Sequence, residues 1–326
     1  MKRFNDILCV VESSETDKPA LERAVALAEN NQASLTVVEV VERVTTGIGI
    51  PEGGPISADL QGAMVSAREQ DLESLVDLYR ARIGIKTRVL TGTLFLEIVR
   101  EVLRSGHDLV IKIPETQDWL DRLFGSDDMH LLRKCPCPVW LIKPQAPKSY
   151  RRILAAVDVD NTCPPTELES RRALNRQILE MAGSLALSDF AELHIGHAWE
   201  APGEGTMRGG FVRLQEEKII AYVDQIERQH EVGLDELMRE VTSHLGQDSL
   251  EYLKPQTHLM KGFARKEIPA LAKRVEADLV VMGTVARTGI PGFIMGNTAE
   301  TILNQLDCSV LAIKPPGFVT PVTLEE

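Results

Sequence analysis

The sequence predicts an α/β protein with two domains, each a five-stranded parallel sheet with helices on both faces. Short apolar segments that suit buried strands alternate with longer segments of helical periodicity along the whole chain. Such alternation is typical of parallel βαβ units with right-handed crossovers. The order of segments also occurs twice, and both copies close on the pattern Cys-x-Val-x-x-Ile-Lys-Pro, at residues 137–144 and 308–315. A length of 326 residues suits two domains of about 150 residues each.

The first half begins with a near-continuous apolar segment of the kind that suits a strand covered on both faces. Its expected strands are residues 7–12, 34–41, 86–90, 109–113 and 138–144. Apolar residues at helical spacing predict helices over residues 19–28, 60–83 and 94–103, and a last helix opens after Gly125.

The second half repeats this order. Its expected strands are residues 153–158, 192–199, 256–260, 279–282 and 309–315. Its expected helices are residues 173–185, 212–245 with an interruption near Gly233, 266–275, and a last helix that opens at Gly296. The apolar last strands of the two halves are expected to pair edge to edge, which would join the halves as an internal pseudo-dimer.

Residues 145–150 have the character of a linker, so the expected domains are residues 1–146 and 150–326. Two stretches rich in Gly and Pro, residues 45–56 and 201–210, follow the second strand of their half and are expected to be loops. They would lie near the carboxyl ends of the strands, where open α/β sheets bind ligands. A lid over a ligand and a solvated loop without a role both remain open.

The composition excludes several classes of partner. A net charge of −12 argues against broad binding of nucleic acid or of anionic membranes, because both require a basic face. No apolar run approaches the roughly 18 residues of a membrane span, and the first residues turn polar too early for a signal peptide. The five cysteines are expected to be reduced thiols, as in a cytoplasmic protein.

Cys135-Pro136-Cys137 could be a metal or redox pair, but a structural role is favoured. Cys308, its counterpart in the second half, has no neighbouring cysteine, and no His or Cys cluster completes a zinc set.

Catalytic and metal-binding patterns are otherwise weak. His194 and His197 lie three residues apart in a strand, so they are expected to face opposite sides of the sheet rather than share a metal. Asp127, Asp128 and His130 suit the start of a helix better than a small metal cluster. Neither a Ser-His-Asp order nor a Walker-type Gly-Lys-Ser/Thr is present, so no catalytic residue is assigned.

The segment 283–298 carries the strongest sign of ligand binding. It follows a strand, contains Gly283, Gly289, Gly292 and Gly296, and opens a helix. Glycines let the backbone approach a phosphate, and the free N–H groups at a helix start attract it. Asn297 or Thr298 can cap this helix. A glycine-rich turn that binds nothing is the alternative that spacing alone leaves open.

The chain resembles the tandem universal stress proteins, specifically the universal stress protein E group. The resemblance rests on Gly-Thr-Val-Ala-Arg-Thr-Gly-Ile at 283–290, Gly-Asn-Thr-Ala-Glu at 296–300, His-Leu-Leu-Arg-Lys-Cys-Pro at 130–136, Gly-His-Asp-Leu-Val at 106–110 and Thr-Pro-Val at 320–322. It covers essentially the whole chain. It implies Rossmann-like domains of the adenine nucleotide alpha hydrolase-like kind.

Nucleotide-binding members of the family hold ATP phosphates on the signature Gly-x2-Gly-x9-Gly-Ser/Thr. An Asp that ends the first strand and the backbone of the second strand hold the nucleoside. The resemblance therefore places a possible ATP, ADP or AMP site, with Mg, in the second half. It assigns the contacts to Asp158, Ala198, Gly283, Thr284, Ala286, Arg287, Gly296, Asn297 and Thr298. Ala286 departs from the family at the second glycine and Asn297 at the Ser/Thr.

The first half departs further from the family pattern. Glu12 stands where the Asp would be, Ile113 and Pro114 replace the first glycine region, and only Gly125-Ser126 survives. Asp127 and Asp128 then place negative charge at the helix start, where they would repel a phosphate.

The resemblance implies a stress-response protein that binds a nucleotide or a related ligand in its second half, and a homodimer is possible. Two alternatives remain open: slow ATP hydrolysis in the second half, and binding of a non-nucleotide or lipid-like ligand or of a protein partner.

Overall fold

The computed structural model describes residues 4–12, 17–44, 54–115, 126–161, 164–209, 214–284 and 295–324. These residues form two compact units. Unit 1 contains the described residues up to Lys148 together with Met295 and residues 307–324. Unit 2 contains those from Ser149 to Thr284 and residues 296–306. The sequence-based boundaries, 1–146 and 150–326, describe the two repeats and stay a prediction.

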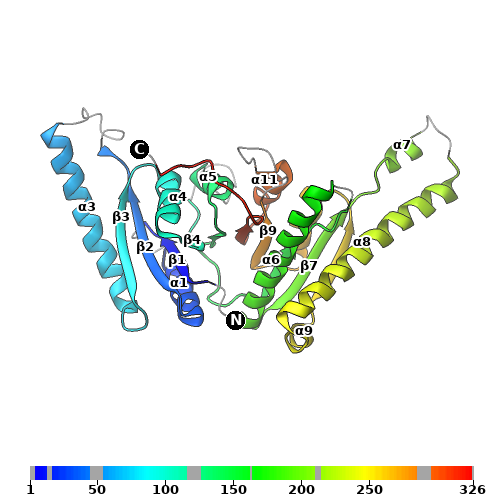
Figure 1. Ribbon diagram of the computed structural model, residues 1–326, viewed down its shortest axis with the longest axis horizontal. Helices are drawn as coiled ribbons and strands as arrows, with labels where there is room; N and C mark the ends of the chain where they lie inside the picture. The colour runs from blue at the N-terminus through cyan, green and yellow to red at the C-terminus, as the bar shows by residue number, and fades with distance from the viewer. Residues whose placement is uncertain are drawn as a thin grey trace. The chain divides into compact units, whose positions relative to one another are not determined.

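Unit 1 is built on six strands in the spatial order β3-β2-β1-β4-β5-β10 (Figure 1). These strands are β1 (Asp6–Val10), β2 (Ser34–Val41), β3 (Ile85–Thr91), β4 (Leu109–Lys112), β5 (Val139–Leu141) and β10 (Ser309–Ile313). The first five run parallel. Their connections are α1 (Lys18–Asn31), α3 (Pro55–Val76) with the short 3-10 helix η2 (Asp77–Tyr79), α4 (Leu94–Ser105) and α5 (Ser126–Lys134).

The last strand of the second repeat lies in unit 1. β10 pairs antiparallel with β5, so that Leu311 stands opposite Trp140 and Val310 opposite Leu141. Both strands are fully buried. The predicted edge-to-edge pairing of the two last strands is therefore confirmed, and it fits an internal pseudo-dimer of the two repeats.

Unit 2 is built on four parallel strands in the order β9-β6-β7-β8. They are β6 (Arg152–Ala156), β7 (Glu192–Trp199), β8 (Gln256–Lys261) and β9 (Leu279–Gly283). Its helices are α6 (Pro165–Asp189), α7 (Glu204–Arg208), α8 (Glu216–Leu245), α9 (Gln247–Leu253), α10 (Ala264–Arg274) and α11 (Asn297–Leu303). The order matches β4-β1-β2-β3 of unit 1, so both repeats share one Rossmann-like topology and the predicted fold class is confirmed.

Right-handed crossovers decide which face each helix covers. In unit 2, α6 and α8 lie on one face, and their contact is visible in Figure 1. The other face is covered by α10 and α11, which also contact each other. Both faces of the central strands are thus shielded from water, which explains why β6 and β9 read as apolar runs without alternation.

Two expectations about the second half were wrong. Helix α8 runs through Gly233 without interruption, since a glycine inside a helix costs only about 1 kcal/mol. Its missing side chain lets α8 approach the segment after β6: a Cβ at Gly233 would lie 3.4 Å from Val159. The segment 201–210, expected to be a loop, contains the short helix α7.

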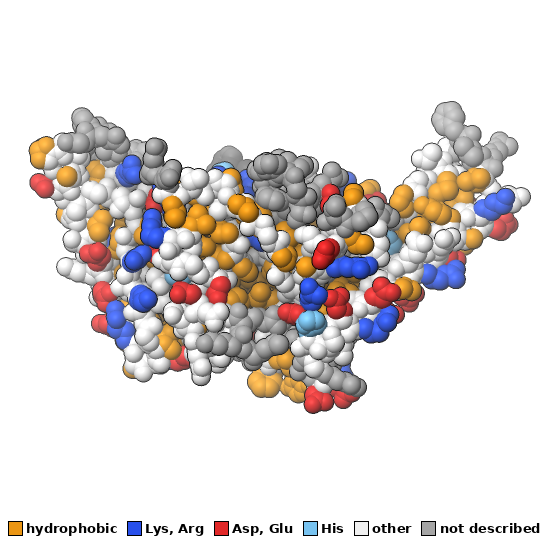
Figure 2. Space-filling view, viewed as in Figure 1, with side chains coloured by type: hydrophobic (Ala, Val, Ile, Leu, Met, Phe, Trp, Pro, Cys, Tyr) orange, Lys and Arg blue, Asp and Glu red, His pale blue; other side chains and the backbone are white. Residues whose placement is uncertain are grey.

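Helix α7 and the start of α8 form a small apolar cluster with the end of β7. Trp199, Ala201, Ile219 and Val223 are its buried members. Figure 2 shows hydrophobic side chains gathered over these elements. Tyr222 fixes the turn before α7, because its hydroxyl donates to the Pro202 carbonyl at 2.8 Å. The apolar cluster explains why this glycine-containing segment takes up helical structure.

Replacing Leu311 with Ala should destabilise unit 1 by about 2–5 kcal/mol, because Leu311 is fully buried where β10 meets β5 and its truncation leaves a cavity. Leu78, with 81% of its surface exposed, is the matched control: Leu78→Ala should change the free energy of unfolding by less than about 0.5 kcal/mol. Urea unfolding of both variants measures the difference. Equal stability of the two would contradict the burial of this strand pair.

Candidate functional site

The carboxyl edge of the unit 2 sheet contains a topological switch point. The chain leaves β6 toward β7 on one side, and β9 lies on the other side of β6. The crossovers on the two sides of β6 therefore lie on opposite faces, and open α/β sheets bind ligands beyond the carboxyl ends of the strands at such a point.

Three of the predicted ligand-binding residues stand at one level of this edge. Ala156 of β6 pairs with Met282 of β9 and with Gly196 of β7. Two residues after these positions, the chain reaches Asp158 beyond β6, Thr284 beyond β9 and Ala198 in β7. The structure thus brings together residues that lie far apart in the sequence.

Asp158 is held by its backbone and keeps an exposed carboxylate. Its N–H donates to Asn175 Oδ1 at 3.0 Å, and Asn175 Nδ2 donates to its carbonyl at 2.7 Å. The carboxylate, whose side chain is 58% exposed, pairs with Arg171 at 3.1 Å and accepts the N–H of Asp160 at 3.1 Å. Asn175 on α6 therefore fixes the backbone where the chain leaves β6, and Arg171, one turn earlier, forms an ion pair with the Asp158 carboxylate.

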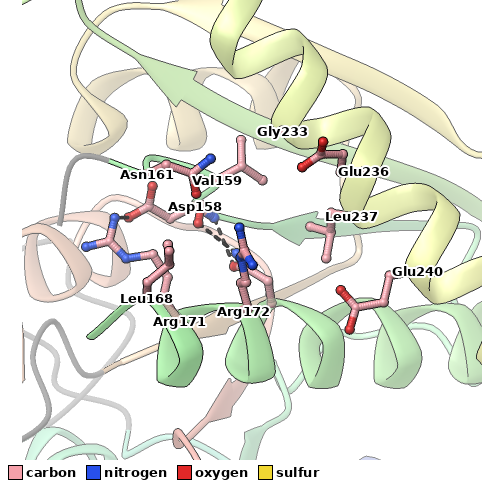
Figure 3. A pocket seen from close by; sticks show the side chains of 11 residues that line it. Asp158, Val159, Asn161, Leu168, Arg171, Arg172, Gly233, Glu236, Leu237 and Glu240 are labelled. Atoms are coloured by element: carbon pink, nitrogen blue, oxygen red, sulfur yellow. Dashed lines mark hydrogen bonds and ion pairs between the residues drawn. The ribbon is translucent and has the colours of Figure 1, made fainter. Parts of the chain in front are cut away.

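A small cavity of about 120 Å³ lies beside Asp158, between the segment after β6 and helices α6 and α8 (Figure 3). Its lining combines arginines from α6 with glutamates from α8. The lining residues are Asp158, Val159, Asn161, Leu168, Arg171, Arg172, Asn175, Gly233, Glu236, Leu237 and Glu240. Pockets that enclose a whole small-molecule ligand measure about 300–1,000 Å³, so this cavity can hold at most a part of one.

The glycine Gly283 has a packing role in this structure. A Cβ at Gly283 would lie 2.7 Å from Leu174 Cδ2, so a larger residue would force the Leu174 side chain of α6 to move. This contact explains the glycine without any phosphate. Gly283 is therefore a poor position at which to test ligand binding.

The described ends of the glycine-bearing segment are joined by one hydrogen bond. Thr284 is buried, and its carbonyl accepts the N–H of Gly296 at 3.2 Å. Gly296 is the N-cap of α11, so the expected capping by Asn297 or Thr298 is wrong: both follow the cap and are exposed. The predicted contacts Ala286 and Arg287 lie outside the described residues.

In unit 1, a buried ion pair joins the carboxyl end of β4 to the start of α5, the counterparts of β9 and α11. Lys112, the last residue of β4, donates to Asp128 Oδ1 at 2.5 Å, and Asp128 Oδ2 accepts the N–H of Glu115 at 2.8 Å. Asp128 is fully buried in the first turn of α5, where the helix dipole favours an anion. A carboxylate of the chain thus lies buried at the helix start of unit 1 that corresponds to the start of α11 in unit 2.

Further negative charge surrounds this ion pair. Burial raises the pKa of Glu115; Lys112 opposes that rise, while Asp128, Asp127 and Glu12 add to it. A phosphate entering here would meet the same carboxylates. This burial of carboxylates is a structural reason for the predicted repulsion of phosphate at this helix start. His130, which the sequence left as a candidate for a metal cluster with Asp127 and Asp128, stacks on Phe95, with ring centroids 4.7 Å apart.

Removing one partner of the ion pair should cost far more than removing both. Asp128→Leu leaves the Lys112 ammonium buried without its carboxylate and should destabilise unit 1 by about 3–5 kcal/mol. The double variant Lys112→Met/Asp128→Leu should recover most of this loss. Hydrogen exchange of the β4 and α5 amides measures both. A double variant as unstable as the single one would contradict the account.

Two histidine pairs flank β7. His197 Nδ1 donates to the Val157 carbonyl at 3.2 Å, so its Nε2 accepts from His230 Nδ1 of α8 at 2.9 Å. On the other face, His194 Nδ1 lies 3.1 Å from His258 Nε2 of β8. The expectation that His194 and His197 face opposite sides is confirmed. Within the described part of the chain, no group of three or more His, Cys, Asp or Glu residues could hold a metal ion.

Each of these contacts requires a neutral accepting ring, because the accepting nitrogen must keep its lone pair. Burial lowers the pKa of His194, His197 and His258 below the ordinary value of 6.5. Glu192 opposes the shift at His194, and Asp158 opposes it at His197, where His230 adds to it. His194 adds to the shift at His258. The unfolded chain therefore binds protons before the folded one as the pH falls.

Unit 2 should lose stability as the pH falls from about 7 to about 5, because the lowered folded-state pKa values make protonation favour unfolding. The double variant His197→Gln/His230→Gln should flatten part of this dependence. Urea midpoints across the pH range give the answer, and an unchanged slope in the double variant would contradict it.

Comparison with known proteins identifies relatives along the whole chain. The model of the universal stress protein family matches residues 3–143 and 149–314. Universal stress protein E of Escherichia coli (strain K12) is 31% identical over 334 residues, which cover 100% of this chain and 99% of that protein. The universal stress protein E homolog of Haemophilus influenzae is 28% identical, with 96% of this chain and 98% of that protein covered. The resemblance seen in the motifs is confirmed.

Solved structures agree with this result. A functionally unknown protein from Pseudomonas aeruginosa PAO1 matches with a TM-score of 0.64 and 28% identity, over 96% of this chain and 94% of that one. A universal stress protein from Archaeoglobus fulgidus DSM 4304 matches with a TM-score of 0.61, over 96% and 99% of the two chains. At 18% identity, the latter supports the fold alone.

Proposed function

The chain belongs to the universal stress protein family, and from this premise we propose that it supports the cellular stress response by binding an adenine nucleotide at the switch point of unit 2. The protein would act in the cytoplasm. In the described residues, no helix combines the length and the apolar character that crossing a membrane requires.

One observation carries this proposal: the edge of unit 2 offers polar groups at the switch point, whereas the edge of unit 1 is closed by Lys112 and Asp128. In unit 2 the carboxylate of Asp158 is exposed, and α11 starts beside the end of β9 through the Gly296–Thr284 hydrogen bond. The same fold thus presents one open and one closed version of the site.

Each residue has a distinct role in the proposed complex. The Asp158 carboxylate would accept hydrogen bonds from the ribose hydroxyls, in exchange for its contact with Arg171. The backbone of Ala198, at the end of β7, would border the base. The amides that open α11, at Asn297 and Thr298, have no partner within a helix and would donate to phosphate oxygens.

Mg²⁺ would arrive bound to the phosphates and keep several of its waters, as it commonly does beside nucleotides. The proposal concerns binding, and turnover is a separate claim. A slow ATPase would require a group that positions water against the terminal phosphate, and no residue is assigned that role here.

The test is native mass spectrometry of the purified full chain with Mg-ATP, and one nucleotide per chain is expected. Gly296→Val should weaken binding by about tenfold or more, because a side chain would block close approach of the phosphate. The backbone at Gly296 has φ −62° and ψ 136°, which any residue adopts, so the change tests approach rather than strain. Asp158→Asn should also weaken binding.

Glu12→Gln, at the counterpart of Asp158 in unit 1, is the matched control and should leave binding unchanged. Absence of nucleotide at millimolar Mg-ATP, or equal binding by the Gly296→Val and Glu12→Gln variants, would refute the proposal. Phosphate release by the wild-type chain, abolished in Gly296→Val, would show turnover at the same site. A different molecule released from the purified protein would point to the non-nucleotide alternative.

A further inference from the structure

A pair of cysteine thiols lies in contact at the start of β5. Cys135 Sγ and Cys137 Sγ are 3.5 Å apart, with a bend of the chain at the intervening Pro136. Residues two apart have Cα atoms within about 7 Å, which is the range that a disulfide can bridge. Cys135 is fully buried, and Cys137 keeps 8% of its surface exposed.

A buried lysine from the second repeat stands against this pair. β10 pairs antiparallel with β5, with Ala312 opposite Val139, and the same register continued by two residues puts Lys314 opposite Cys137. The Lys314 ammonium donates to the carbonyl of Leu132 in the last turn of α5. Only 6% of Lys314 is exposed. Burial lowers the pKa of Lys314 to about 8, while the two thiols oppose that shift.

The three groups favour the thiolate of Cys135 over that of Cys137. Burial alone would raise the pKa of Cys135, but hydrogen bonds from the thiol and the backbone of Cys137, together with the Lys314 charge, bring that pKa below its ordinary value of 9.0. The hydrogen bond to Cys135 and burial raise the pKa of Cys137. A nucleophilic sulfur beside a protonated one is the arrangement of reactive dithiols.

The second repeat supplies an internal comparison. Continued in the other direction, the β5–β10 register puts Lys143 opposite Cys308. There the lysine pairs with the Asp307 carboxylate at 2.6 Å, and the residue two before the cysteine is Leu306. The same backbone frame therefore carries a lysine without a dithiol, so packing of the strand pair does not require a cysteine at the position of Cys135.

We propose that Cys135 and Cys137 are a redox site at which a peroxide forms a reversible disulfide, with Lys314 stabilising the reacting thiolate. This site would add an oxidation response to the family's stress role and does not depend on nucleotide binding in unit 2. Because the pair is nearly covered, only a small oxidant such as hydrogen peroxide would reach it.

The reaction balances with one peroxide. The Cys135 thiolate attacks one peroxide oxygen, the O–O bond breaks, and the leaving hydroxide takes a proton to depart as water. Cys135 is then a sulfenic acid. The Cys137 sulfur attacks the Cys135 sulfur as its thiol proton leaves, the S–S bond forms, and the S–O bond breaks to release a second water. Two thiols and one peroxide thus give one disulfide and two waters.

The experiment treats the reduced full chain with hydrogen peroxide, blocks the remaining thiols with N-ethylmaleimide and maps the peptides by mass spectrometry. The peptide that holds Cys135 and Cys137 should lose two hydrogen atoms and regain them with dithiothreitol, while Cys9 and Cys308, both buried, should stay alkylatable after unfolding. In the Cys137→Ser variant, a sulfenic acid at Cys135 should accumulate and react with dimedone.

Lys314→Met should slow disulfide formation by about tenfold and shift its pH profile upward, because the thiolate loses its cation. Lys143→Met, at the equivalent position of the first repeat, should leave the rate unchanged. Three results would overturn the proposal: a Cys135–Cys137 peptide that stays reduced, oxidation of Cys9 and Cys308 at the same rate, or an identical rate in a folded Lys314→Met protein. If Lys314→Met does not fold, the peptide map and the Cys137→Ser result decide alone.

Discussion

The parallel strands are the constraint on which both candidate edges depend. Within each unit they bring their carboxyl ends to one edge, so residues from separate parts of a repeat meet there. In unit 2 this constraint gathers Asp158, Ala198 and Thr284 at one level, although they are spread over more than a hundred positions of the chain. In unit 1 the same constraint gathers Lys112 and Asp128. Whether an edge can receive an anion then depends on a few side chains.

The two repeats keep one frame and have diverged in chemistry. Asp128 in the first turn of α5 binds Lys112 and the Glu115 N–H, whereas α11 begins with a glycine and exposed polar residues. A charge of the chain's own is always present at full local concentration, so an external phosphate would have to compete with Asp128 for Lys112 and would leave that buried carboxylate without its cation. The last strands have diverged as well: the first repeat carries the dithiol, and the second repeat supplies the lysine that faces it.

Periodicity predicted the fold because buried parallel strands and amphipathic helices leave strong patterns, and the pairing of the last strands followed from their apolar composition. Tertiary packing decided the rest. Gly233 was expected to interrupt a helix, but Val159 packs against it, and residues 204–208, expected to lie in a loop, are helical beside the Trp199 cluster. Gly283 was interpreted as a phosphate glycine, and the structure adds that Leu174, from a helix more than a hundred residues earlier, packs closely against it. Lys314 could not be connected with Cys137 without the strand register. Arg171 and Asn175 belong to no sequence motif, and only their place in the first turns of the helix after Asp158 would have pointed to these two residues.

The central claim is that one edge of this protein is open to a nucleotide and the other is closed by its own ion pair. Hydrogen exchange of the full chain with and without Mg-ATP tests it most directly, because it reports both edges in one experiment. The account predicts slower exchange at the amides after β6, at the end of β9 and in the first turn of α11, with no change around Lys112, Glu115 and the start of α5. Protection in unit 1, or no protection in either unit at saturating Mg-ATP, would contradict it.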